Sequence, residues 1–349
     1  MSRLRLPPLI VILGPTASGK SALAIALAQR LDGEILACDS TQVYRHFDIG
    51  TGKVPVAEQR GIPHHLVDLV EPGEVFTAGE YRRRALEALD DVRRRGKLPI
   101  LTAGTGLYLR ALLEGLAEAP ERSEALRERL RAKAAKHGPL HLHRMLARLD
   151  KDAAARIAPR DTQKIIRAIE IRKLAGKTVG EVHRRGREPL AGFQVLKIGL
   201  QPPREALYAR INARVDAMIA AGWPDEVRAL IARGVPPDAK PFQFIGYSEL
   251  REALARSSVV GAQHAVPGTI SWRNRSHPPK RGAGDSSTPR VATEAVAAVI
   301  PQIQQATRQF AKRQITWFRK EPDVTWLPGF GDDPETLAAA EALLGSPIS

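Results

Sequence analysis

The sequence has few cysteines, few acidic residues and no long apolar run. Cys38 is the single cysteine, which excludes an intramolecular disulfide and a cysteine-rich zinc site, and we interpret it as a buried strand residue. The longest apolar runs, such as LIVIL at 9–13, are far shorter than the roughly 18 residues that indicate a membrane span. This run follows a few positive charges, as in a signal peptide, but a glycine-rich loop comes directly after it. We therefore predict a first β-strand, no membrane partner and a cytoplasmic protein.

The shortage of acidic residues leaves a formal net charge of +15 over 349 residues. Residues 121–190 hold 19 Lys and Arg but only 9 Asp and Glu, so this segment carries +10 of the total. A basic surface attracts polyanions, either nucleic acid or an acidic membrane surface. For this segment we favour nucleic acid over an ordinary solvated face. The absence of coiled-coil heptads favours a monomer.

The order of apolar segments predicts an α/β fold with a helical insertion. Buried strands are expected at LIVIL, EILAC, LPILTAG and FQVLKIGL, with a possible further strand at HHLVDLV (64–70). Helices are expected at 20–31, 77–95, 105–115, 203–222 and 292–313. Alternating strands and helices indicate a parallel sheet covered on both faces. We divide the chain into a first core part (1–116), an all-helical insertion (117–192) and a second core part (193–349), with a loop or disordered segment at 256–290.

The stretch GPTASGKS at 14–21 has the full phosphate-loop spacing between a strand and a helix. Its glycines let backbone N–H groups point at a phosphate, and the helix adds its positive end. Lys20 supplies a charge and Ser21 a hydroxyl for Mg²⁺. The expected phosphate-binding residues are Gly14, Pro15, Thr16, Ala17, Ser18, Gly19, Lys20 and Ser21.

An acid is missing where a nucleoside triphosphatase would need one. The strand LPILTAG ends without a carboxylate, whereas the strand EILAC is followed by Asp39. At the carboxyl edge of the sheet Asp39 is placed to act as a general base, although capping the next segment is the ordinary alternative. Thr105 is placed either to orient a substrate amine or to cap the next helix. Arg214 is placed to reach a diphosphate, but its spacing also suits a solvent-exposed helix residue.

Histidines give no metal signal. His64 and His65 are adjacent and lack a third ligand at useful spacing. His141 and His143 are interpreted as surface residues. The sequence therefore predicts no histidine-based metal site.

The chain resembles the tRNA dimethylallyltransferases, also called tRNA isopentenyltransferases. The matching stretches, in the family's order, are GPTASGKS, DSTQVY, DIGTGK, PHHLVDLVEP, AGTGLYL, QKIIRAIEI, IGYSEL and TRQFAKRQITWFRK. They cover nearly the whole chain except 256–290. The DSTQVY and AKRQITWFR stretches are not general features of phosphate-loop proteins.

This resemblance implies a reaction and a set of roles. The loop would bind the diphosphate of dimethylallyl diphosphate with Mg²⁺ and without ATP, and the acceptor would be N6 of adenosine 37 in the anticodon stem-loop of tRNAs that read codons starting with U. Asp39 would be the base, Thr105 would lie near the acceptor amine and Arg214 would hold the diphosphate. The implied tRNA contacts are Asp39, Ser40, Thr41, Gln42, Thr105, Arg127, Gln163, Lys164, Ile165, Ile166 and Arg167. Two departures are Lys164, where the family usually has Arg, and FQFIGYSEL, which lacks a basic residue beside IGY.

Two rival functions remain open from the residues. An ATP-dependent small-molecule phosphotransferase suits the first 116 residues but leaves the basic helical insertion unexplained. An RNA-binding structural protein with a vestigial loop explains the charge but gives no role to Asp39.

Overall fold

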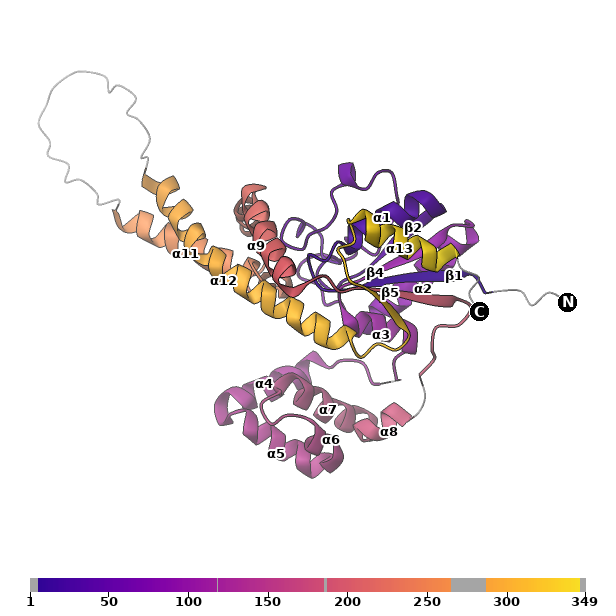
Figure 1. The fold of residues 1–349 in the computed structure, drawn as a ribbon. Helices are drawn as coiled ribbons and strands as arrows, with labels where there is room; N and C mark the ends of the chain where they lie inside the picture. The colour runs from indigo at the N-terminus through magenta and orange to yellow at the C-terminus, as the bar shows by residue number, and fades with distance from the viewer. Residues whose placement is uncertain (1–5, 118, 185–186, 265–286, 346–349) are drawn as a thin grey trace, which may run out of the picture. The chain divides into compact units, whose positions relative to one another are not determined.

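The computed structural model describes residues 6–117, 119–184, 187–264 and 287–345. The chain forms two compact units, one made of residues 1–109 and 192–349, the other of residues 110–191. We call them the sheet unit and the helical unit (Figure 1). The helical unit begins a few residues before the predicted start at 117 and ends one residue before the predicted end at 192.

The sheet unit is built on six parallel strands, which confirms the predicted α/β class. The strands are β1 (Pro8–Leu13), β2 (Gly33–Cys38), β3 (His64–His65), β4 (Leu98–Ala103), β5 (Gln194–Leu200) and β6 (Val324–Leu327), in the spatial order β3-β2-β4-β1-β5-β6. The possible strand at 64–70 is wrong beyond His65: the chain turns away, and only Val70 forms an isolated bridge, with Tyr44. Strand β6 was not predicted from the sequence.

Helices cover both faces of the sheet (Figure 1). Helices α1 (Lys20–Leu31) and α13 (Pro334–Gly345) share a core with the strands, in which Leu23, Leu27 and Ala340 pack against Ile10, Ile35 and Ile198. Helix α2 (Ala78–Arg94) lies on the other face, where the Tyr81 hydroxyl donates to Ala37 O at 3.2 Å. Thr77 caps α2 by accepting from Glu80 N at 3.1 Å, as its sequence predicts. Helix α3 (Gly106–Glu114) follows β4.

The remaining helices of the sheet unit follow β5. They are α9 (Arg204–Ala220), α10 (Trp223–Ala232), α11 (Tyr247–His264) and α12 (Ser287–Phe318), with 3-10 turns at Val56–Glu58 and Lys240–Gln243. Helices α11 and α12 lie side by side (Figure 1). The predicted loop at 256–290 is therefore wrong at both ends, because 256–264 and 287–290 are helical, and its middle lies outside the described residues.

The helical unit contains helices and no strand among its described residues. The helices are α4 (Glu124–His137), α5 (Pro139–Leu149), α6 (Lys151–Arg156), α7 (Thr162–Ala175) and α8 (Val179–Arg184). Leu130, Leu142, Leu146, Ile165 and Ile169 form its core. In the described part of the whole chain, no helix combines the length and apolarity that a membrane span needs.

Candidate functional site

The candidate site lies where three neighbouring strands end. Strands β1 and β2 both pair with β4, so Leu13, Cys38 and Ala103 end side by side. The N–H groups of Gly104 and Thr105 both donate to Cys38 O at 3.0 Å, which ties the turn after β4 to the end of β2. The phosphate loop, Asp39 and Thr105 are thereby brought to one edge of the sheet, as predicted.

The phosphate loop is braced by a C-terminal segment that sequence reasoning missed. Gly331 N donates to Ser18 O at 2.9 Å. Gly19 has φ +87°, and a Cβ there would lie 2.6 Å from Gly331 N and 2.8 Å from Asp332 Oδ1. Only glycine fits this position. Arg210 pairs with both oxygens of Asp332 at 2.7 and 2.8 Å, which fixes the bracing segment.

The side chain of Lys20 folds back onto the phosphate loop. Its Nζ donates to Gly14 O at 2.9 Å and Pro15 O at 2.8 Å, which leaves one of its three N–H donors for a ligand. Burial lowers the pKa of Lys20 to about 8; the negative charge of Asp39 opposes this and the positive charge of Arg214 adds to it. Lys20, Asp39 and Arg214 therefore act on one another electrostatically.

Asp39 uses one carboxylate oxygen to cap the next segment and leaves the other oxygen without a hydrogen bond among the described residues. Its Oδ1 accepts from Thr41 N at 2.9 Å and from the Thr41 hydroxyl at 2.8 Å, which is the capping alternative. Its Oδ2 faces Gly104 so closely that an added Cβ there would overlap it. Among the described residues, Oδ2 accepts no hydrogen bond, and it is this oxygen that is available to take a proton.

Thr105 is tied to Ser40 across the two strand ends. Its hydroxyl oxygen accepts from Ser40 N at 3.0 Å, and the two hydroxyls lie 3.2 Å apart. The hydroxyl therefore bonds to the residue after Asp39 instead of capping α3. Thr105 and Asp39 are held in one rigid corner of the site.

Arg214 is not the solvent-exposed helix residue that its spacing allowed. Burial lowers the pKa of its guanidinium; Arg210 adds to this effect and Asp39 opposes it. The guanidinium lies against Gly52, where an added Cβ would overlap its Nη2. Within the described residues it has no hydrogen bond or ion pair. A half-buried cation without a partner is suited to an anionic ligand.

Gln314 is a further site residue, and sequence reasoning assigned it no role. Its Oε1 accepts from Thr16 N at 2.8 Å and its Nε2 donates to Gly104 O at 2.8 Å, with 7% of the residue exposed. It lies in AKRQITWFR, which the resemblance singled out. The sequence signal was therefore present, but only the fold shows which of these side chains faces the site.

A cavity of about 390 Å³ lies beside Ser21. Its walls are formed by β2, β4 and the segment from Asp48 to Asp68, with Gln42 and Thr102 next to the site. Lys53, in the DIGTGK stretch, borders it but uses its ammonium on Tyr44 O, Asp48 and Asp68 at 2.6, 2.7 and 2.5 Å. Lys53 thus holds the loop together and has no free donor for a ligand.

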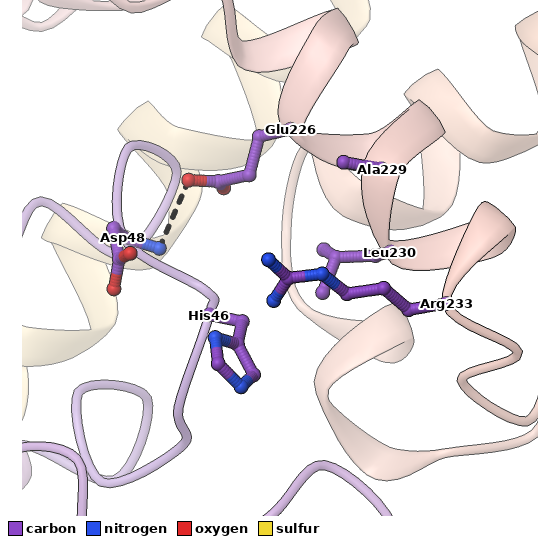
Figure 2. A pocket seen from close by; sticks show the side chains of 6 residues that line it. All are labelled: His46, Asp48, Glu226, Ala229, Leu230 and Arg233. Carbon is purple, nitrogen blue, oxygen red and sulfur yellow. Dashed lines mark hydrogen bonds between the residues drawn. The ribbon is translucent and has the colours of Figure 1, made fainter.

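A smaller pocket of about 190 Å³ lies where the loop around Asp48 meets α10, and Figure 2 shows its lining. Glu226 accepts from Asp48 N at 3.0 Å and Ile49 N at 2.8 Å, and Tyr247 of the IGYSEL stretch donates to it at 2.5 Å. Glu226 therefore fixes the loop around Asp48, which continues to Gly52 and covers Arg214. None of the predicted site residues lines the pocket.

No metal cage is present in the described part of the chain, where no three His, Cys, Asp or Glu side chains converge. His65 donates to or accepts from buried Glu34 at 2.6 Å, and His143 contacts Ala154 O at 3.0 Å, so these histidines have structural partners. His141 and His143 are both partly exposed. Ser21 remains the residue placed to offer a hydroxyl to a metal.

In the helical unit, only some of the residues that the resemblance implies as tRNA contacts are accessible. Ile165 and Ile166 are buried in its core, so their side chains have no surface for RNA. Arg127 donates to both oxygens of Glu170 at 2.9 and 2.7 Å, and 13% of its side chain is exposed, so it serves the packing of α4 on α7. Gln163 and Lys164 are exposed, and a third of the Arg167 side chain is exposed. Within the helical unit, these three residues form the accessible part of the predicted set.

The family model described as IPP transferase matches residues 42–321. The chain belongs to the IPP transferase family. Among members of this family, the tRNA dimethylallyltransferase of Solibacter usitatus is 46% identical over 95% of this chain and 96% of its own length, and that of Koribacter versatilis is 47% identical over 97% and 98%.

Solved structures also match nearly the whole chain. The tRNA isopentenylpyrophosphate transferase of Bacillus halodurans is 33% identical, with a TM-score of 0.61, over 97% of this chain and 95% of that one. A eukaryotic dimethylallyltransferase acting on tRNA is 26% identical, with a TM-score of 0.73, over 97% and 78%. These likenesses to solved structures therefore extend over both units.

Proposed function

We propose that this IPP transferase transfers a dimethylallyl group from dimethylallyl diphosphate to N6 of adenosine 37 in tRNAs that read codons starting with U. The observation that carries the proposal is the charge arrangement at the sheet edge. The negative charge of Asp39 acts on both Lys20 and the guanidinium of Arg214, which has no hydrogen bond or ion pair within the described residues, and Arg214 in turn acts on Lys20. A cationic cradle beside a carboxylate suits a reaction in which diphosphate leaves while a proton is removed. The names of the curated relatives and of the tRNA-acting structural neighbour agree with this reaction.

The leaving group is bound by the phosphate loop. Its backbone N–H groups and the start of α1 favour an anion, the spare donor of Lys20 adds a charge-assisted hydrogen bond, and Arg214 provides a planar fork. Both cations are removed from bulk water, where their interaction with a diphosphate is stronger than at the surface. The loop therefore stabilises the negative charge that builds up on the departing diphosphate.

The nucleophile is prepared by Asp39. The exocyclic amine of adenine is weakly nucleophilic because its lone pair is delocalised into the ring. As N6 attacks the allylic C1, the N6–C1 bond forms, the C1–O bond breaks with its electron pair going to diphosphate, and a proton passes from N6 to Asp39 Oδ2. In this proposal the hydroxyl of Thr105, which Ser40 holds in place, orients the amine. Holding both reactants in line supplies much of the rate gain.

The cofactor in this proposal is Mg²⁺, held by the Ser21 hydroxyl and by diphosphate oxygens. The donor set fits, because Mg²⁺ keeps several waters and uses few protein ligands beside substrate phosphates. When bound, the ion neutralises charge on the diphosphate. Ser21 lies at the start of α1, one residue after Lys20, so the hydroxyl and the ammonium serve the same ligand.

The tRNA partner binds through its anticodon stem-loop. A base stacked in that loop must be extruded before its N6 can reach Asp39, as in other base-modifying enzymes. The net charge of +10 over residues 121–190 predicts phosphate contacts and strongly salt-dependent affinity. Gln163, Lys164 and Arg167 on α7, and Ser40 to Gln42 beside the site, are the proposed contacts. We further propose a monomer that acts in the cytoplasm.

The experiment is a transfer assay with purified protein, Mg²⁺, labelled dimethylallyl diphosphate and unmodified tRNA that carries A37. Label is expected on wild-type tRNA without added ATP, and a tRNA with guanosine at position 37 serves as the control. An absence of transfer to any tRNA, combined with ATP turnover on a metabolite, would replace the proposal with the phosphotransferase function. Binding of RNA without either reaction would favour the structural RNA-binding function.

The base assignment is tested with Asp39→Ala and Asp39→Asn. Both changes are expected to reduce transfer at least about 100-fold, which is the lower end of the range for losing a general base, while tRNA affinity stays within about threefold. Asp90→Asn is the matched control, because Asp90 is an exposed acid on α2 that pairs only with arginines of its own helix. Retention of most of the rate in Asp39→Asn would end the base assignment.

A further inference from the structure

Gln314 of α12 connects the two halves of the site. Its amide accepts from Thr16 N in the phosphate loop and donates to Gly104 O in the turn after β4, both at 2.8 Å. The sequence separations are 298 and 210 residues, so no local structure requires either bond. In the buried position that Gln314 occupies, each bond is worth more than at the surface, and losing either leaves a backbone group without its partner.

The two partners fix the orientation of the amide. Thr16 N can only donate and Gly104 O can only accept, so the oxygen of Gln314 must face the loop and its nitrogen must face the turn. A carboxylate could take the first bond but not the second. Glutamine is therefore the side chain of this length that serves both partners at neutral pH.

The groups that Gln314 joins lie next to the reacting atoms. Thr16 belongs to the loop that binds the leaving group. Gly104 lies directly against Asp39 Oδ2, the oxygen that takes the proton. The Gln314 amide thus bridges the phosphate loop, which binds the leaving group, and the turn that lies against the base, Asp39.

Helix α12 is well anchored on either side of this amide. One turn before Gln314, Ala311 is buried in a cluster with Ala17 and Ile211, and Ile315 packs against the same cluster. Three residues after it, Trp317 lies against Gly106, where an added Cβ would overlap the indole. A rigid helix is what a side chain needs if it is to set a distance between two loops.

We infer that Gln314 is a positioning residue that sets the separation between the phosphate loop and the Asp39 corner during dimethylallyl transfer. This inference rests on the proposed function. Gln314 touches neither reactant; it acts through Thr16 and Gly104. Its loss should therefore slow the chemical step and leave the binding of each substrate largely intact.

The first test uses Gln314→Ala, with Gln304→Ala as the matched control. Gln304 is on the same helix and donates to Asp216 at 2.9 Å, away from the loop. Gln314→Ala is expected to lower the single-turnover rate roughly 100-fold, as misplacement by about 1 Å can do, while the dissociation constants of inorganic diphosphate with Mg²⁺ and of tRNA change less than about threefold. Gln304→Ala should keep the wild-type rate. A rate loss matched by equal losses of binding and melting temperature would show a merely structural role and overturn the inference.

The second test uses Gln314→Glu over a range of pH. The carboxylate repels Gly104 O, but the protonated acid both donates and accepts and so restores both bonds; burial favours this neutral form. The ratio of variant to wild-type single-turnover rates should rise as the pH falls from 8 to 5.5. A flat ratio would contradict the hydrogen-bonding role.

The two failures can be told apart. If the wild-type protein transfers no dimethylallyl group to tRNA, the proposed function fails. If the wild type transfers and Gln314→Ala transfers at a rate within threefold of it, the proposed function stands and only the role of Gln314 is withdrawn.

Discussion

Replacing Glu170 by Gln should destabilise the helical unit without altering the sheet unit. The Glu170 side chain has no exposed surface and accepts from Arg127, Arg167 and Ser123 N at 2.7 to 2.9 Å. Burial alone would raise its pKa, but these hydrogen bonds outweigh burial and lower the pKa to about 2. Relative to the ordinary value of 4.5, a pKa of about 2 corresponds to roughly 3 kcal/mol of stabilisation. Breaking a buried ion pair by removing one partner costs a similar 3–5 kcal/mol.

The pH dependence of this stabilisation has a definite sign. The folded-state pKa lies below the unfolded value of 4.5, so the contribution is complete above pH 4.5 and is lost as the pH falls toward 2. The difference in unfolding free energy between wild type and Glu170→Gln should therefore shrink over that range. Amide hydrogen exchange in α4, α5 and α7 of the full chain is the measurement, because it reports the opening of the helical unit itself.

Glu124→Gln is the matched control for this change. Glu124 pairs with Arg131 on α4, but more than half of each side chain is exposed, so a loss of at most about 1 kcal/mol is expected. If Glu170→Gln lowers the opening free energy by less than 1 kcal/mol at pH 7, or if its effect is the same at pH 3 and pH 7, the account of Glu170 as the electrostatic centre of the helical unit is wrong.

Three further predictions concern the sheet edge. Gly104→Ala should push the Asp39 carboxylate away from its position and reduce transfer at least tenfold, because an added Cβ overlaps Oδ2; unchanged single-turnover rates would contradict the close contact. With the pKa of Lys20 near 8 in the free protein, the KM for dimethylallyl diphosphate should rise as the pH increases through 8, and Lys20→Met should remove this dependence. Arg214→Lys should weaken inorganic diphosphate binding by roughly tenfold in calorimetry, since a lysine loses the planar fork, and equal affinity would argue that the guanidinium serves only packing.

The parts of the site that the sequence predicted are those that follow a strand directly. The phosphate loop, Asp39 and Thr105 each come just after the end of a buried strand, and parallel strands place their carboxyl ends together. The parallel strand arrangement thus brings the three motifs together in one site. The cap that Thr77 provides to α2 is likewise local, because its hydroxyl accepts from Glu80 N, only three residues further along the chain.

The parts that sequence reasoning missed depend on distant packing. Nothing in the helical spacing around Arg214 says that the loop at Gly52 covers it, so burial could not be anticipated. Gln314 and Gly331 reach the phosphate loop from the far end of the chain, and helical periodicity does not reveal which face of α12 meets the loop. The chain after His65 has apolar residues typical of a strand, but Leu66 and Asp68 adopt positive φ values and turn it away from the sheet.

The acid that a nucleoside triphosphatase needs after the central strand is absent for a steric reason. Gly104 follows β4, and the Oδ2 atom of Asp39 occupies the space where any side chain at Gly104 would begin. A carboxylate at position 104 and Asp39 in its present place therefore exclude each other. The same glycine presents its carbonyl to Gln314, which holds the turn at this close distance. The missing acid and the aspartate after β2 therefore have one cause: at this strand edge the Asp39 carboxylate occupies the space beside Gly104, next to the phosphate loop.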